Sequence, residues 1–340
     1  MHRIPDLNSS LAEESAAARE RLCSYPWLFR QGGRKLRLHI VGLGDVGRTV
    51  AVGLRVLGGE VLDRIGIYDL NDAQAARIEM ELNQISAPCG RSRMPRAEIL
   101  REENLFACDV FLYCATKAVP AVDSRPQDVR MAQYEANRRI VAVYAAKAAE
   151  ESFSGLFGVV SDPVDLLCMA AFRASKKDGH SLHPEQIQGF GLGVMYARAA
   201  YYAGKAADRG EEGAVWFPEE GRVFGPHGQD LVAANSICPE HYDDALSRSL
   251  TEQTVHANLE MRALGFKPYI APAFSSAAFS VLAAVSGEWC DSARYLNGLY
   301  FGARNRTTAE GTEWEARELP EALFARVEKA YHSVEAVLCN

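Results

Sequence analysis

Three glycines and one acidic residue near the start of the chain have the types and spacing of a dinucleotide-binding turn. Gly42, Gly44 and Gly47 end the extended apolar run 36–42 and lead into an apolar helical pattern. In such a turn the first glycine permits the tight bend, the second lets a pyrophosphate approach the backbone, and the third allows close helix–strand packing. Asp69 ends the next apolar run, about 20 residues on. Its carboxylate can accept hydrogen bonds from both ribose hydroxyls of NAD, and it would repel the 2′-phosphate of NADP.

The helix that follows the glycines begins at Asp45 and Val46. Its first turn offers free N–H groups and the positive end of the helix dipole to the phosphates. The alternative is a glycine-rich turn that binds no ligand. We predict NAD as the cofactor, bound by Gly42, Gly44, Asp45, Val46, Gly47 and Asp69.

His227 is the histidine best placed for acid–base chemistry. It lies between Gly225 and Gly228, and glycines let a loop approach a ligand closely. An imidazole gives and takes a proton near neutral pH, which suits a catalytic acid or base. The alternative is an ordinary histidine in a surface loop.

Several further segments resemble the L-lactate/malate dehydrogenase family. They keep the family's order from about residue 35 to 338, and the sequence is identified as a divergent member. The matching segments are VVSDPVDLL at 159–167 (the family's Asn-Pro-Val-Asp element), GFGLGVMYAR at 189–198 (its aspartate and arginine segment), FGPHGQD at 224–230 (its Gly-x-His-Gly loop), YFG at 300–302 and the terminal helix at 323–337.

The resemblance implies hydride transfer between NAD(H) and a 2-hydroxy or 2-oxo carboxylic acid. His227 would then deliver the proton to the carbonyl oxygen of the substrate. Arg198 matches the family arginine that grips the substrate carboxylate, a task that suits a planar guanidinium with two parallel donors. A helix-surface arginine is the alternative for Arg198.

The resemblance also implies roles for residues of the loop after 114 and for one serine. Arg130 stands seven residues before Asn137, as does the family arginine that polarises the ketone. The loop is longer than usual, so Arg125 or Lys117 could serve instead, and Arg125 would suit a dicarboxylate. Asn137 is assigned to the cofactor side of the site. Ser275 and Ser276 fall near the pocket wall, and one of them is expected either to contact substrate or to cap the following helix.

Two positions depart from the family pattern. Met195 stands where the family has the aspartate that orients its histidine, and Asp162 replaces the asparagine before proline. One hypothesis is that Asp162 partners His227 or balances a cationic group on an atypical substrate, such as an oxo or imino acid that bears an amine. The other is that turnover has been lost and the chain is a non-catalytic NAD(H)-binding sensor or assembly protein.

Alternating strand and helix patterns must position these residues. We expect strands at 36–42, 63–69, 109–114 and 155–160 and helices at about 45–58, 72–84 and 128–150. After residue 185 we expect helices at 192–206, 241–264, 274–287 and 320–336, with strands near 295–304 and 312–319. This alternation predicts an α/β fold with a Rossmann-type, doubly wound parallel sheet, followed by an α+β substrate domain.

The expected organisation is an N-terminal arm (1–34), an NAD-binding domain (35–184) and a substrate domain (185–340). The arm carries an expected helix at 13–22 and an apolar patch at 25–29 that needs a surface to cover it. From the resemblance we expect a homodimer or homotetramer.

Composition excludes several classes of protein. A net charge of -7 and a pI near 5.7 argue against nucleic acid or an anionic membrane surface as partner. The sequence shows neither a membrane-spanning run nor a secretory signal. Its eight cysteines occur singly, without zinc-finger spacing, so we expect reduced thiols, no metal site and a cytoplasmic location. A metal-dependent, NAD-using hydrolase is correspondingly disfavoured.

Overall fold

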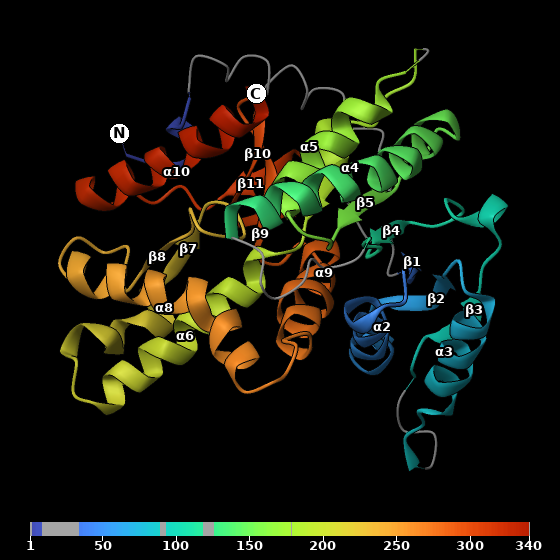
Figure 1. The fold of residues 1–340 in the computed structure, drawn as a ribbon, viewed down its shortest axis with the longest axis horizontal. Helices are drawn as coiled ribbons and strands as arrows, with labels where there is room; N and C mark the ends of the chain where they lie inside the picture. Colours follow the sequence, from blue (N-terminus) through green and yellow to red (C-terminus); the bar gives the residue numbers. More distant parts are fainter. Residues whose placement is uncertain (1, 9–33, 89–92, 118–125, 178, 340) are drawn as a thin grey trace.

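The computed structural model describes residues 2–8, 34–88, 93–117, 126–177 and 179–339, although the side chains of 126–130 lie outside this description. A nine-stranded sheet forms its centre, in the order β11-β10-β9-β6-β5-β4-β1-β2-β3 (Figure 1). Its strands are β1 (Leu36–Val41), β2 (Leu62–Tyr68), β3 (Arg96–Ile99), β4 (Val110–Tyr113), β5 (Leu156–Val159), β6 (Ile187–Gly189), β9 (Cys290–Leu296), β10 (Leu299–Thr308) and β11 (Gly311–Trp314).

Strands β1 to β6 run parallel to one another. Beyond β6 the sheet continues through β9, β10 and β11, each paired antiparallel to its neighbour. The larger helices are α2 (Asp45–Leu57), α3 (Asp72–Gln84), α4 (Pro126–Glu150), α5 (Val164–Ser175), α6 (Leu192–Asp208), α8 (Asp244–Ala263), α9 (Phe279–Val285) and α10 (Glu321–Cys339). This arrangement confirms the predicted α/β, Rossmann-type class. It also places β1 between β2 and β4, so the strand order reverses at β1, where such sheets bind their ligands.

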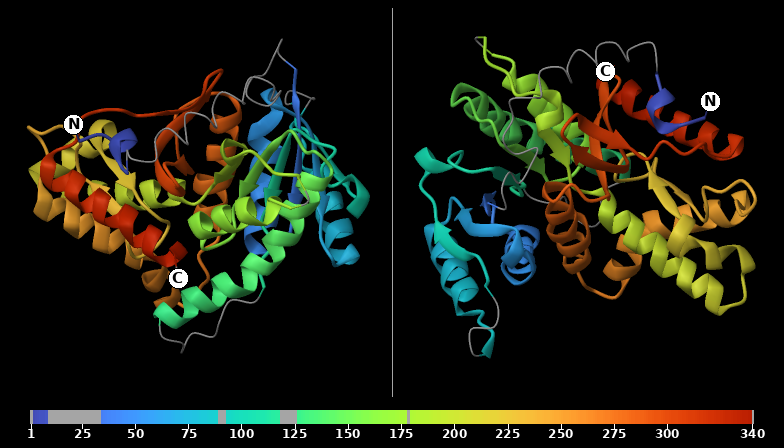
Figure 2. Two further views of the ribbon diagram at one scale, coloured as in Figure 1. Left: turned by 90° about the horizontal axis from the view of Figure 1, so that it is seen from above. Right: turned by 180° about the vertical axis from the view of Figure 1, so that it is seen from behind.

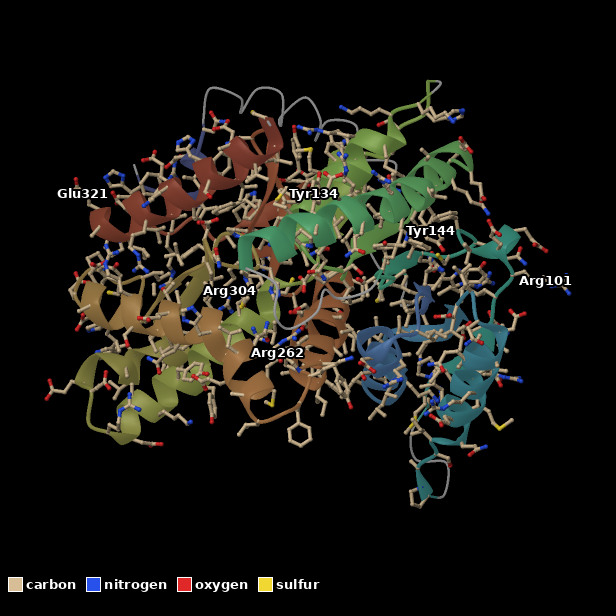
Figure 3. All side chains as sticks on the ribbon, viewed as in Figure 1. Arg101, Tyr134, Tyr144, Arg262, Arg304 and Glu321 are labelled. Carbon is tan, nitrogen blue, oxygen red and sulfur yellow. The ribbon has the colours of Figure 1, made fainter. Side chains whose placement is uncertain are left out.

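Helices cover both faces of the sheet, as the alternating side chains of its strands require. Along β4, Phe111 and Tyr113 point into the core beneath α4, α5 and α10, whereas Val110 and Leu112 point into the core beneath α2, α3 and α9. Tyr144 on α4 packs on the first of these faces, with its ring centroid 6.0 Å from that of Phe111 (Figure 3). Figure 2 shows the two helical layers from two further directions.

A second, smaller sheet carries the loop that contains His227. Strands β7 (Arg222–Phe224) and β8 (Val232–Ala234) pair antiparallel and pack with α6 and α8 in a third apolar cluster. In Figure 1 this unit lies at the opposite end of the molecule from α3. The hairpin therefore presents residues 225–231 as the connection between its two strands.

Several predicted elements differ from the observed ones. Strand β3 was missed because it has only four residues, with mixed polarity. The predicted strand at 295–304 is wrong, because Asn297 and Gly298, both with positive φ, make the turn between β9 and β10. The predicted strand at 312–319 shortens to β11 at 311–314. The predicted helix at 274–287 begins as a π-helix (Pro272–Ala278) before α9.

The two ends of the described chain meet. Ile4 and Leu7 are buried, and the N–H of Leu319 donates to the carbonyl of His2. The expected helix at 13–22 and the apolar patch at 25–29 lie outside the described residues. Within the described residues, no helix has both the length and the apolar character needed to cross a membrane.

Candidate active site

The glycine turn lies between β1 and α2 and leaves space above Gly44. Gly42 has φ of +90°, and a Cβ built on Gly47 would lie 1.9 Å from the carbonyl oxygen of Gly42. A Cβ on Gly44, by contrast, meets no atom of the described residues within 4 Å. Two glycines are thus required by the turn itself, and the third keeps the surface open, as the approach of a pyrophosphate requires.

Asp69 follows β2 directly and lies against the same turn. Its Oδ2 accepts a hydrogen bond of 2.7 Å from the N–H of Leu43, and its Oδ1 accepts one of 2.9 Å from Asn71. At the start of α2, Asp45 pairs with Arg48 at 2.5 Å, and Val46 lies in the same first turn. The turn, the open glycine and the adjacent carboxylate fit the diphosphate and ribose of NAD.

Asn137 joins the loops that follow β4 and β5. It lies on α4 and is fully buried. Its Oδ1 accepts from the N–H of Lys117 at 3.0 Å, and its Nδ2 donates to the carbonyl of Asp162 at 2.8 Å. Both ends of the amide are therefore engaged within the protein. This leaves no exposed surface for the predicted cofactor contact and makes Asn137 a positioning residue.

The ring of His227 is held from one side by the backbone of Gly191. Nδ1 lies 2.9 Å from the Gly191 carbonyl oxygen, and the His227 N–H donates to Oδ2 of the buried Asp165 at 2.9 Å. Because a carbonyl only accepts, Nδ1 carries the hydrogen and Nε2 is left as the acid–base nitrogen. A side chain at position 191 would crowd the ring, since a Cβ there would lie 3.1 Å from Cβ of His227.

Asp162 approaches the same ring from the other side. Its Oδ1 lies 3.5 Å from Nε2 of His227, and its side chain is 49% exposed, against 13% for that of the histidine. The carboxylate therefore faces the nitrogen that exchanges protons, not the nitrogen that orients the ring. This position agrees with the hypothesis that Asp162 partners His227.

Arg198 lies on α6 and is partly buried beside Met195. Its Nη2 donates to Oδ1 of Asn258 at 2.5 Å, and its Nη1 lies 3.7 Å from the sulfur of Met195. Burial lowers the pKa of Arg198, and the negative charge of Asp162 partly offsets this effect. Met195 itself is 3% exposed within an apolar cluster, so it fills the core at the position where an aspartate was expected.

Ser276, rather than Ser275, supports the site. The Ser276 hydroxyl accepts from the N–H of Val194 in the first turn of α6 and donates to the Gly191 carbonyl at 2.6 Å. It thus caps a helix distant in sequence and holds the oxygen that His227 also contacts. Neither serine caps its own helix, which begins at Pro272, and Ser275 lies within that π-helix.

Three residues of this region were missed from the sequence. Asp165, Gly191 and Asn258 each bond to a predicted site residue. Only Asp165 and Gly191 could have been found from the sequence, since both lie within segments that resemble the dehydrogenase family (159–167 and 189–198). Arg125 lies outside the described residues, and Arg130 belongs to α4 with its side chain outside them.

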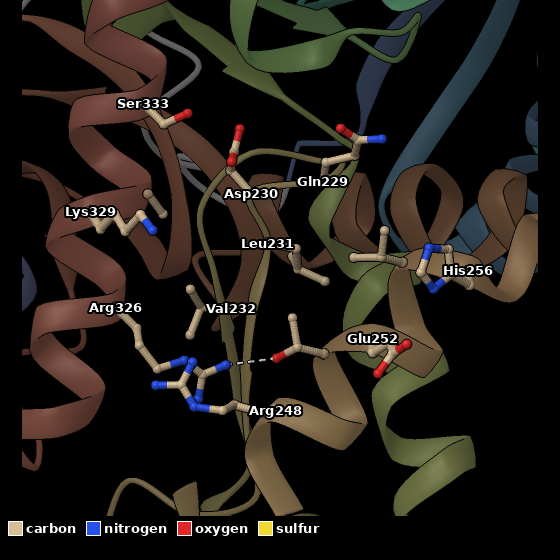
Figure 4. A pocket seen from close by; sticks show the side chains of 13 residues that line it. Gln229, Asp230, Leu231, Val232, Arg248, Glu252, His256, Arg326, Lys329 and Ser333 are labelled. Atoms are coloured by element: carbon tan, nitrogen blue, oxygen red, sulfur yellow. Dashed lines mark hydrogen bonds between the residues drawn. The ribbon is translucent and has the colours of Figure 1, made fainter. Parts of the chain in front are cut away.

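A separate cavity lies beyond the histidine loop, between β8, α8 and α10 (Figure 4). Its volume is about 590 Å³, and its lining includes Asp230, His256 and Lys329. Arg326 also lines it and donates to the Thr251 hydroxyl at 2.9 Å. Neither His227 nor Asp162 lines this cavity, so we separate it from the candidate active site.

The known proteins that resemble this chain are lactate and malate dehydrogenases. Residues 36–183 match the NAD binding domain of lactate/malate dehydrogenases and form an NAD-binding domain. An L-lactate dehydrogenase of Bacillus caldotenax is 27% identical over 177 residues (51% of this chain, 50% of the relative). One of Treponema denticola is 28% identical over 204 residues (60% and 58%). The chain thus spans about half the length of the curated relatives it matches.

Solved structures share the fold over most of the chain. A minor L-lactate dehydrogenase from Enterococcus mundtii superposes with a TM-score of 0.72 at 19% identity, covering 89% of this chain and 98% of that one. The malate dehydrogenase from Picrophilus torridus gives 0.69 at 21% identity, covering 89% and 96%. At these identities the likeness establishes the fold.

Proposed function

We propose that this chain, a divergent member of the lactate/malate dehydrogenase family, is an NAD-dependent oxidoreductase that interconverts a 2-hydroxy and a 2-oxo carboxylic acid. NAD(H), when bound, supplies or accepts the hydride. The observation that carries the proposal is the geometry of His227, whose ring is fixed by Gly191 while Nε2 faces Asp162.

In this proposal the residues of the chain bind and orient the substrate and move one proton. Nε2 of His227 gives its proton to the carbonyl oxygen during reduction and takes it back during oxidation. Arg198 pairs with the substrate carboxylate through its guanidinium. Asn137 holds the loops that carry Lys117 and Asp162, and so keeps Asp162 beside the histidine.

The position of Asp162 supports an atypical substrate. Its carboxylate lies on the Nε2 side of His227, where the reacting carbonyl must come, and it is exposed enough to meet a ligand. A carboxylate there favours a cationic group and disfavours a second acidic one. We therefore propose a 2-oxo or imino acid that carries an amine, with Arg198 and Asp162 recognising its two opposite charges.

A non-catalytic NAD(H)-binding protein is the second candidate. The observations that favour it are the apolar setting of Met195 and the existing hydrogen bond between Arg198 and Asn258. A protein of this type would bind NADH through Gly42 to Asp69 without turning over any 2-oxo acid.

The test is NADH oxidation with neutral, acidic and amine-bearing 2-oxo acids, with NADH binding measured by fluorescence on the same preparation. We expect turnover to be fastest with the amine-bearing acids. Asp162→Asn should lower kcat/KM for them by roughly 10- to 100-fold, the effect of losing one hydrogen bond to a charged group, and Asp162→Glu should restore part of it. Faster turnover of pyruvate or oxaloacetate would contradict the proposed substrate. Tight NADH binding without any turnover would favour the second candidate.

We also propose a division into an arm (1–34), an NAD-binding domain (35–184) and a substrate domain (185–340), assembled as a homodimer or homotetramer in the cytoplasm. The central sheet crosses this division, because β6 and β9 to β11 continue the strands of the first domain.

A further inference from the structure

A group of metal-ligating side chains lies at the open end of the β7–β8 hairpin. Glu220 immediately precedes β7, and Cys238 and His241 follow β8. Because the two strands are antiparallel, with Arg222 opposite Ala234, these flanking segments meet at the same end. His227 lies at the other end, in the connecting loop.

The three side chains converge on one point. One ligand atom from each of Glu220, Cys238 and His241 lies within 4.8 Å of the other two. Donors around a tetrahedral zinc ion are about 3.3 to 3.8 Å apart, as bond lengths of about 2.0 to 2.3 Å require. Side-chain movements of about 1 Å would therefore close the site around an ion.

The surrounding chain holds these ligands in place. The Ile237 N–H donates to the carbonyl of Glu220 at 3.1 Å, which ties the two flanking segments together. The N–H of His241 donates to the carbonyl of Cys238 at 3.1 Å, so both ligands belong to one tight turn. The imidazole of His241 stacks on Trp216 with ring centroids 3.6 Å apart and planes 4° apart, which fixes its orientation.

We propose that Glu220, Cys238 and His241 bind a divalent metal ion of the zinc class. The Cys238 thiol donates to Oε2 of Glu240 at 2.7 Å, so a second carboxylate lies beside the sulfur. Thiolate, imidazole and carboxylate are the donors that zinc takes in proteins. The ion joins the two segments that flank the strands at the open end of the hairpin, opposite the loop that carries His227.

Cobalt(II) titration of the reduced, full-length chain tests the proposal without reference to activity. We expect one equivalent to produce the visible bands of tetrahedral cobalt together with a sulfur-to-cobalt charge-transfer band, and zinc to abolish both. Fluorescence of Trp216 should be quenched in step, because this ring stacks on His241.

Substitutions identify the ligands. Cys238→Ser should remove the charge-transfer band and weaken affinity by more than the 10- to 100-fold that loss of an outer-shell partner typically costs. His241→Gln should weaken affinity comparably while keeping the sulfur band. Cys339→Ser, at an exposed thiol on α10, is the matched control and should behave as wild type.

Circular dichroism shows whether each variant is folded, and a variant that fails to fold leaves the other to decide. The absence of a charge-transfer band in the wild-type chain would overturn the proposal. So would an unchanged band in folded Cys238→Ser.

Discussion

The acid–base behaviour of His227 depends on two different oxygen atoms. The Gly191 carbonyl fixes the tautomer, but a neutral oxygen stabilises an imidazolium less than a carboxylate does. Asp162 supplies the missing charge from the Nε2 side, at 3.5 Å. The same carboxylate can therefore bind a cationic group of the substrate beside the ring.

For this single residue we predict that His227→Asn lowers kcat by about 10²- to 10⁴-fold, the usual contribution of a general acid. The Kd for NADH should stay within about twofold, because no part of the glycine turn changes. Stopped-flow reduction and NADH fluorescence measure the two quantities. His256→Asn, on the exposed face of α8, is the control. Equal losses of kcat in both variants would remove His227 from its proposed role.

The turn between β1 and α2 sets different requirements for each of its glycines. Gly47→Ala places a methyl group 1.9 Å from a backbone oxygen, so we expect both a lower Tm and loss of NADH binding. Gly44→Ala meets no described atom within 4 Å and should weaken NADH binding at nearly unchanged Tm. Gly204→Ala on α6, also with open space, should gain about 0.5 to 1 kcal/mol of stability and leave binding unchanged. Unimpaired NADH binding by Gly44→Ala would place the pyrophosphate elsewhere.

The start of α6 depends on a hydroxyl from another helix. Ser276→Ala leaves the N–H of Val194 without its acceptor and removes one of two donors to Gly191. We expect a loss of about 1 to 3 kcal/mol in the free energy of unfolding, measured by urea denaturation. Ser286→Ala, at an exposed serine, should change it by less than about 0.5 kcal/mol. Equal values for the two variants would show that the cap contributes nothing.

For the molecule as a whole, a buried carboxyl on β9 adds a pH dependence to stability. Asp291 lies opposite Arg304 in the sheet, and its Oδ1 is buried without a hydrogen-bond partner among the described residues. Burial raises its pKa to about 6, although Arg304 and Arg222 oppose this effect. The folded state therefore binds the proton more tightly than the unfolded state, so this contribution is complete below pH 4 and is lost as pH rises through 6.

Asp291→Asn should remove that dependence. Between pH 4 and 6 the wild type should lose up to about 3 kcal/mol from this group, and the variant should lose correspondingly less. Above pH 6 the variant should be the more stable protein. Urea denaturation across this range measures both trends, with exposed Asp208→Asn as the control. Parallel curves for Asp291→Asn and wild type would contradict the assigned pKa.

The sequence by itself determined the features that rest on neighbouring residues. The glycine turn, the acidic residue after β2 and the α/β alternation were all predictable, because turn geometry and side-chain periodicity are local properties. Helix α3 was predicted at its observed bounds, and four of the parallel strands within one residue at each end. The wrong strand at 295–304 shows the limit, since only the pairing of β9 with β10 reveals the turn at Asn297.

Only the tertiary structure decided which distant residues meet. Asp162 and His227 come from different sheets, and Ser276 reaches Gly191 from a helix that follows it by 85 residues. The proposed metal ligands escaped a search for paired cysteines because Glu220 and His241 flank opposite strands of a hairpin. These contacts depend on strand order and helix packing, which bring together residues whose separation along the chain carries no periodic signal.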